Sequence, residues 1–112
     1  MKTFAFAMRR HTVADPLTIQ IVKNDLGILP EWFIDGPSTY RAVFAAPIGF
    51  CPRQVIPMLG GEFFYIVAEG AGTQITINTM IDDSTGLEAE LTDYYLELRI
   101  LDNFGQTSAT PE

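Results

Sequence analysis

The chain contains one cysteine and one histidine, Cys51 and His11, and these are the first residues to consider for chemistry. Nucleophilic catalysis needs a nucleophile beside a base, and nothing in the sequence brings these two residues together. Cys51 stands in an apolar, proline-containing segment, where a buried and unreactive thiol is expected. His11 follows two arginines, whose like charge disfavours a protonated imidazole. One cysteine and one histidine cannot complete a tetrahedral zinc site, so we predict no enzyme activity, no cofactor and no metal.

An acidic stretch, residues 82–93, is the other place where side chains could do chemistry. It does not follow the EF-hand register, because aligning Gly86 with the sixth position puts Ile81 first, where an aspartate is required. A Ca²⁺ site of another geometry stays open, although a solvated acidic loop is the preferred interpretation. The pair Glu88 and Glu90 is not expected to hydrolyse glycosides, because a general acid needs a less solvated position.

The overall charge excludes some partners. The chain of 112 residues carries 7 basic and 14 acidic side chains, a formal net charge of −7. Because phosphate binding needs clustered Lys and Arg, we expect no nucleic acid as a partner. No apolar run is long enough to span a bilayer and no signal peptide is visible, so synthesis in the cytoplasm is expected. Only 19% of residues are charged, which is expected when a partner covers part of the surface, although small β domains can also be charge-poor.

The elements that must position any functional residue are predicted to be strands. Apolar and polar residues alternate with a period of two in most of the chain, which is typical of strands with one buried face. Residues 28–34 contain Pro30 and are expected to form an edge strand or a packed loop. Residues 82–93 fit a single helical turn or a short strand. The alternating or apolar strand candidates are residues 2–8, 17–22, 40–46, 63–68, 73–81 and 94–101.

These segments predict an all-β protein, either a small antiparallel β-sandwich or a β-barrel. Its single domain covers residues 1–105, and residues 106–112 form a flexible C-terminal tail. Residues 47–61 break the alternation, with prolines at 47, 52 and 57, and are expected to form a long Pro-rich loop.

One stretch carries a family resemblance. The run Leu91-Thr92-Asp93-Tyr94-Tyr95-Leu96-Glu97-Leu98-Arg99, followed by Asp102-Asn103-Phe104-Gly105, resembles the penultimate strand of immunoglobulin-like and fibronectin type III domains. The resemblance implies an Ig-like sandwich with one further strand after the turn. Only residues 106–112 remain for that strand, so the tail, the N-terminus or a neighbouring subunit must supply it, or the fold is different.

Two apolar segments marked by prolines, residues 28–34 and 47–59, have no evident chemical role. One interpretation is that both cover the domain's own core. The other is that they contact neighbouring subunits, since exposed aromatic and methionine side chains mark interfaces. On the second interpretation, the candidate interface residues are Trp32, Phe33, Phe50, Val55, Ile56, Met58 and Leu59.

These features predict a non-enzymatic structural protein that binds other protein subunits, as a homo-oligomer or in a larger assembly. Its general character is similar to that of accessory proteins of bacteriophage virions: capsid decoration (cement) proteins and small neck, tail or baseplate components. That similarity implies location in the virion; otherwise the protein is expected to be cytoplasmic. The alternative is a carbohydrate- or ligand-binding β-sandwich module, with Trp32, Tyr40 and Tyr65 as stacking platforms.

Overall fold

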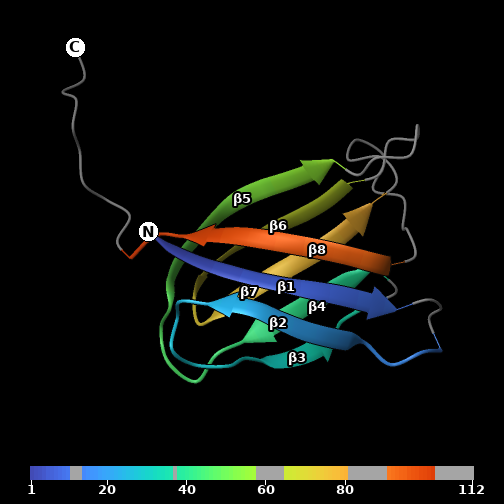
Figure 1. Ribbon diagram of the computed structural model, residues 1–112, viewed down its shortest axis with the longest axis horizontal. Helices are drawn as coiled ribbons and strands as arrows, with labels where there is room; N and C mark the ends of the chain where they lie inside the picture. Colours follow the sequence, from blue (N-terminus) through green and yellow to red (C-terminus); the bar gives the residue numbers. More distant parts are fainter. Residues whose placement is uncertain (11–13, 37, 58–64, 81–90, 103–112) are drawn as a thin grey trace, which may run out of the picture.

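The computed structural model describes residues 1–10, 14–36, 38–57, 65–80 and 91–102. In these residues the chain forms two antiparallel sheets, ordered β2-β1-β8 and β3-β4-β7-β6-β5, packed face to face as layers (Figure 1). The predicted all-β sandwich is confirmed, and the sheets do not close into a barrel. The strands are β1 (Lys2–Arg10), β2 (Thr18–Asn24), β3 (Glu31–Ile34), β4 (Thr39–Val43), β5 (Gly49–Pro57), β6 (Tyr65–Gly72), β7 (Gln74–Met80) and β8 (Leu91–Ile100).

The alternating pattern of β1 and β8 explains how the three-stranded sheet faces the core. Phe4 lies opposite Leu98, and Phe6 lies opposite Leu96. Directly paired residues project to the same face of a sheet, and all four of these side chains are completely buried. The N-terminal strand β1 therefore supplies the neighbour of β8, which was one of the alternatives left open by the resemblance. Residues 103–112 lie outside the described part of the chain.

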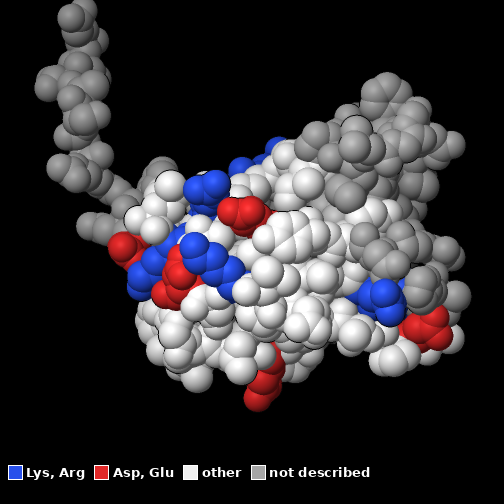
Figure 2. Space-filling view, in the orientation of Figure 1, with Lys and Arg blue, Asp and Glu red and all other residues white. Residues whose placement is uncertain are grey.

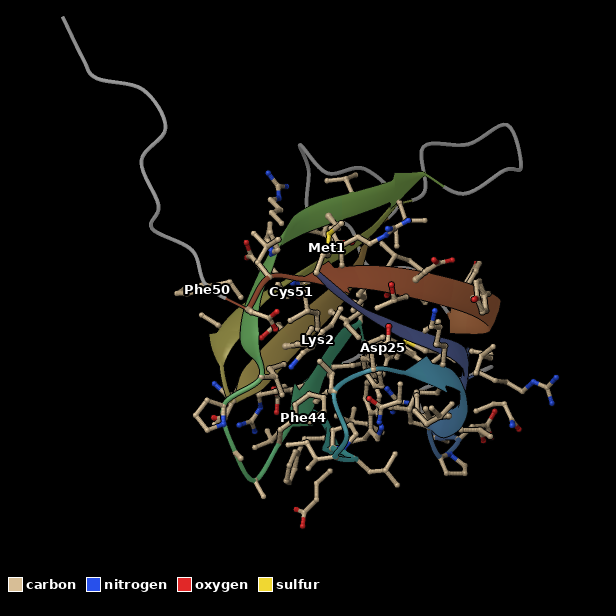
Figure 3. The ribbon with its side chains drawn as sticks, turned by 60° about the vertical axis from the view of Figure 1, so that its left-hand side comes forward. Met1, Lys2, Asp25, Phe44, Phe50 and Cys51 are labelled. Atoms are coloured by element: carbon tan, nitrogen blue, oxygen red, sulfur yellow. The ribbon has the colours of Figure 1, made fainter. Side chains whose placement is uncertain are left out.

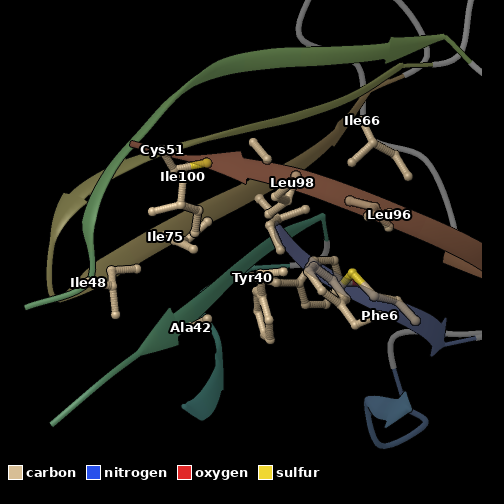
Figure 4. Close-up of a cluster of buried hydrophobic side chains, with 14 of the residues drawn as sticks. Phe6, Tyr40, Ala42, Ile48, Cys51, Ile66, Ile75, Leu96, Leu98 and Ile100 are labelled. Atoms are coloured by element: carbon tan, nitrogen blue, oxygen red, sulfur yellow. The ribbon is translucent and has the colours of Figure 1, made fainter. Parts of the chain in front are cut away.

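Inward-facing side chains of both sheets meet in one hydrophobic core, shown in Figure 4. Tyr40 and Ala42 of β4 and Ile75 and Ile77 of β7 face the β1–β8 pair. Burying several large apolar side chains of this kind contributes about 2 kcal/mol for each, and the core is therefore the main source of stability. Within the described ranges, the structure holds no helix long and apolar enough to cross a membrane.

The β6–β7 hairpin has a tight turn. Ala71 pairs with Gln74, which leaves Gly72 and Thr73 as a two-residue turn. Gly72 has φ 66°, a left-handed conformation that glycine adopts without steric cost. Gly70 belongs to β6, where a Cβ atom would collide with the backbone of Gln74. The close approach of the two strands therefore explains this glycine.

The segment expected to be a long Pro-rich loop contains a nine-residue strand, β5, and this corrects the prediction for most of residues 47–61. Proline is tolerated at sheet edges and bulges, because no ladder hydrogen bond is lost there. β5 is an edge strand, and its register shifts between Cys51 and Gln54, where Pro52 stands. Pro57 ends the strand. The prolines predict a loop here, but Pro52 and Pro57 stand at positions where an edge strand tolerates proline.

Candidate functional site

The two apolar segments that the sequence singles out become the two edge strands of one sheet. β3 lies at one end of the five-stranded sheet and β5 at the other, as Figure 1 shows. The edge-strand alternative for residues 28–34 is thus confirmed for Glu31–Ile34. An edge strand exposes backbone groups and side chains that a central strand covers, so both ends of this sheet can take part in contacts.

At the β3 edge, neighbouring aromatic residues point to opposite faces. Trp32 lies against the core, with its ring centroid 6.4 Å from that of Phe4 and 5.1 Å from that of Phe6. Phe33 points outward and is 39% exposed, and the guanidinium of Arg41 lies 4.9 Å from its ring centroid. Of the two predicted interface residues, Phe33 is therefore available for a contact and Trp32 packs on the protein's own core.

Arg41 is held rigidly over Phe33. Its Nε and Nη2 donate to the two carboxylate oxygens of Asp35 at 2.9 and 3.2 Å, and Nη1 donates to Gln74 Oε1 at 3.0 Å. A bidentate pair of this kind fixes the plane of the guanidinium. The outer side of the β3 edge thus presents the ring of Phe33 beside the Arg41–Asp35 ion pair.

Two further apolar side chains are exposed at or near the β3 edge and were not among the predicted interface residues. Leu29 is 69% exposed and Ile34 is 43% exposed. Both belong to the apolar segment 28–34, whose composition could have identified them. Ile34 follows Phe33 in the strand and projects to the other face, so apolar side chains are exposed on both faces of this edge.

At the β5 edge, Phe50 and Val55 are 39% and 43% exposed, whereas Ile56 is partly buried against the core. Figure 3 shows Phe50 at the outer margin of the molecule, with Cys51 beside it on the same strand. The predicted interface residues Met58 and Leu59 lie outside the described residues. Phe50 and Val55 are thus the predicted residues that the structure places on the surface here.

Strand β8 closes part of the β5 edge. The backbone groups of Phe50 and Leu101 exchange two hydrogen bonds, each 2.8 Å long. Four residues further along β5, the side-chain amide of Gln54 donates to Arg99 O at 3.1 Å and accepts from Arg99 N at 3.0 Å. This amide substitutes for the backbone of a neighbouring strand. At Phe50 the backbone of β5 is already engaged, so β5 offers its side chains to a partner at that position.

Cys51 is 2% exposed, which confirms the predicted burial of its thiol. Burial, and then the negative charge of Glu69, raise the pKa of the thiol from 9.0 to about 11, although a hydrogen bond from Gln54 acts in the opposite direction. The reactive thiolate is therefore scarce at neutral pH. The other residue of the hypothetical dyad, His11, lies outside the described residues.

The other residues considered for metal or ligand binding do not form such a site in the part of the chain that the structure describes. Among the described residues no group of three acidic, histidine or cysteine side chains could hold a metal ion, and most of the acidic stretch 82–93 lies outside them. Arg10 is buried at the end of β1, where its Nε donates to Asp15 O at 3.0 Å and its guanidinium lies 5.8 Å from the Tyr40 ring centroid. Tyr40 is only 1% exposed and cannot be a stacking platform, which corrects that part of the ligand-binding alternative.

Comparison of the chain with protein-family models, with curated proteins and with solved structures finds no match.

Proposed function

We propose that this protein is a non-enzymatic structural subunit that assembles with other protein subunits through the β3 and β5 edges of its five-stranded sheet. One observation carries the proposal: large apolar side chains are exposed at both edges, Phe33 and Ile34 at one and Phe50 and Val55 at the other. Exposed aromatic side chains beside polar ones are typical of protein interfaces.

The opposite positions of the two surfaces favour a head-to-tail contact. Two different surfaces on one subunit form a heterologous interface, which generates a ring when the rotation closes and a filament when it does not. Each added copy then uses one β3 edge and one β5 edge. Repetition around a ring strengthens a contact that is weak between two isolated copies.

The low charge content supports a virion as the setting. With only 19% charged residues, the chain has less charge than a typical soluble domain, as expected when neighbours cover part of the surface. This composition and the small β-sandwich fit an accessory component of a bacteriophage virion, such as a capsid decoration protein or a neck, tail or baseplate protein. The raised pKa of Cys51 also argues against thiol catalysis.

Mixing two half-blocked variants tests the head-to-tail contact. Phe33→Ser impairs the β3 edge, and the double variant Phe50→Ser with Val55→Ser impairs the β5 edge. Light scattering after size exclusion should give each variant alone the monomer mass of 12.4 kDa. An equimolar mixture should form a one-to-one dimer, because each partner keeps one intact edge. The wild-type protein should form larger species as its concentration rises.

Tyr95→Ser is the matched control, because it removes an exposed aromatic ring from the other sheet. The Tyr95→Ser variant should assemble to the same extent as the wild-type protein. Dimers in a solution of one β3-edge or β5-edge variant would indicate a symmetric interface in place of the head-to-tail one. A monomeric wild-type protein at every concentration would contradict self-assembly in solution.

A further inference from the structure

The outer face of the three-stranded sheet has a hollow along its middle strand. The outward residue Ala7 of β1 lies directly between Gln20 of β2 and Tyr95 of β8. Directly paired residues share a face, so a small side chain forms the floor and two larger side chains form the walls. Because neighbouring strands are roughly 4.8 Å apart, the walls stand about 10 Å from each other, wide enough for one pyranose ring.

The hollow has a volume of about 300 Å³ and is lined by Ala7, Met8, Arg9, Thr18, Gln20, Tyr94 and Tyr95. The β1–β8 register shifts between Met8 and Arg10, at the same end of the sheet. A register shift of this kind bends and separates strands locally, and it is often found beside binding sites. Met8 and Tyr94, which pack with the core, also contribute to the lining beside this register shift.

The lining combines the groups that recognise a sugar. Tyr95 is 51% exposed, and its ring can stack against the C–H face of a pyranose. The Gln20 amide both donates and accepts hydrogen bonds, and Thr18 adds a hydroxyl. Adjacent sugar hydroxyls can therefore act either as donors or as acceptors at this site. A small number of polar groups around an apolar surface is the usual design of a small-ligand site.

The net charge of the chain, and not the charge of the lining itself, favours an uncharged ligand. Of the described residues that line it, Arg9 is charged and none is acidic. Figure 2 shows charged side chains gathered over one end of this face, a broad uncharged area over its middle and a smaller charged group at the other end. The ion pairs Lys2–Asp102, Lys23–Asp25 and Arg99–Glu97 contribute to the charged end. The net charge of −7 would repel an anionic glycan.

We propose that this hollow binds a neutral oligosaccharide, with Tyr95 as the stacking platform and Gln20 as the main hydrogen-bonding group. The site goes beyond the assembly function, because its residues belong to the sheet that does not contain β3 and β5. It also differs from the ligand-binding alternative of the sequence analysis, because the stacking residue is Tyr95. Tyr40 is buried and Trp32 packs against Phe4 and Phe6, whereas Tyr95 has an exposed ring.

The test is a titration of the isotope-labelled full chain, followed by its amide NMR spectrum. The probes are maltohexaose, cellohexaose, mannohexaose and N-acetylchitohexaose, each added to about 10 mM to detect a Kd near 1 mM. At least one probe should shift the backbone amides around Ala7 and Tyr95 and the side-chain amide of Gln20. Tyr95→Ala should weaken this binding about tenfold or more, because the stacking surface is lost.

Two matched variants define the site. Gln20→Ala, which removes one exposed polar side chain, should weaken binding while the spectrum keeps the dispersion of a folded protein. Phe33→Ala removes an exposed ring from the other sheet and should leave the affinity unchanged.

Three outcomes of the sugar titration would overturn the proposal. They are no shifts with any of the four probes, shifts that map to β3 or β5, and equal affinity of the wild type and Tyr95→Ala. Concentration-dependent shifts at the hollow without sugar would identify it as a contact between copies and would also overturn the glycan site. If the wild-type protein binds a sugar at the hollow but does not self-assemble, only the proposed assembly function is contradicted.

Discussion

The two lateral sides of the sandwich are closed in different ways. On one side β5 and β8 are joined by hydrogen bonds, from Phe50 to Leu101 and from Gln54 to Arg99. We call this side the hydrogen-bonded seam. On the other side lie β2 and β3, the remaining edge strands of the two sheets (Figure 1). We call that side the packed seam, because apolar side chains contact the core there: Ile19, Ile21, Leu26, Ile28 and Trp32.

The chain between β2 and β3 makes the packed seam possible. Asn24 Oδ1 accepts from Leu26 N at 2.9 Å, and Asn24 Nδ2 donates to Ile28 O at 2.9 Å. These bonds shape a tight turn, and Gly27 takes the positive φ of 81° that it needs. Leu26 and Ile28 are thereby directed onto the core from the side.

The two seams contribute differently to the stability of the fold and to the alignment of the two sheets. A hydrogen bond contributes only about 1 kcal/mol net, because water competes for the same groups, but it fixes direction and register. Apolar burial is less directional and contributes about 2 kcal/mol for each large side chain. We therefore expect the packed seam to supply more stability and the hydrogen-bonded seam to determine how the sheets are aligned.

The largest effect is expected from Trp32→Ala, which removes the main side chain of the packed seam. Loss of its contacts with Phe4 and Phe6 should lower the free energy of unfolding by about 3 kcal/mol. Phe33→Ala is the control, since the adjacent ring points outward, and its cost should stay below about 1 kcal/mol. Urea unfolding followed by circular dichroism measures both. Equal losses of unfolding free energy in Trp32→Ala and Phe33→Ala would show that the packed seam does not contribute more stability than the outer surface of β3.

Gly49→Ala should break the hydrogen-bonded seam at its end. Gly49 has φ 109°, and a Cβ atom there would collide with the carbonyl oxygen of Leu101. Strain and displacement of Leu101 together should cost about 2–3 kcal/mol.

Gly27→Ala separates the two contributions, because Gly27 also has a positive φ but no atom lies within 4 Å of the added Cβ. It should cost only about 1 kcal/mol. The difference between the unfolding free energies of the two variants therefore measures the contact of Gly49 with Leu101. Identical costs would mean that Leu101 moves away from Gly49 without loss of stability.

Gln54→Ala sharpens the comparison further, because it removes both side-chain hydrogen bonds to Arg99 and leaves the Phe50–Leu101 pair intact. The global cost should be about 1 kcal/mol, since water replaces part of the lost bonding. Hydrogen exchange of the Arg99 amide should accelerate clearly more than that of core amides. Gln74→Ala, which removes an exposed contact with Arg41, should leave Arg99 exchange unchanged.

The sequence predicted the strands well where one face is buried, and less well at the edges. The alternation of Phe4 and Phe6 in β1 and of Leu96 and Leu98 in β8 identifies their inward faces, and all four side chains are buried. β5 was mistaken for a loop because edge position and bulges, which permit proline, depend on strand order and cannot be read locally.

The candidate surfaces were only partly predictable for the same reason. The apolar run at Trp32 and Phe33 indicates that one ring is inward and one outward, but the pairing partner decides which. The hollow over Ala7 has no signal along the chain at all. It exists because Gln20 and Tyr95, which are 75 residues apart, stand on either side of a small residue, and only the register brings them together.

The smallest effect concerns Cys51, which lies inside the hydrogen-bonded seam beside Gln54. Its pKa is raised to about 11, so the native state holds the thiol proton more tightly than the unfolded chain does. Between about pH 9 and 11 the unfolded state therefore releases a proton that the native state keeps, and stability falls as the pH rises through this range. The slope of unfolding free energy against pH should be less steep in Cys51→Ala, and equal slopes would contradict the raised pKa.

The rate of thiol labelling also tests the environment of Cys51 beside Gln54, in this case at neutral pH. At neutral pH a pKa of about 11 in place of 9.0 leaves about 100-fold less thiolate, so iodoacetamide should react at least that much more slowly with the native protein than in urea. Gln54 Nε2 donates to Cys51 Sγ at 3.2 Å, a bond that favours the thiolate. Gln54→Ala should therefore raise the pKa of Cys51 further, provided that the seam stays closed. Faster labelling in that variant would instead show that one amide side chain holds β5 against β8 and keeps water from the thiol.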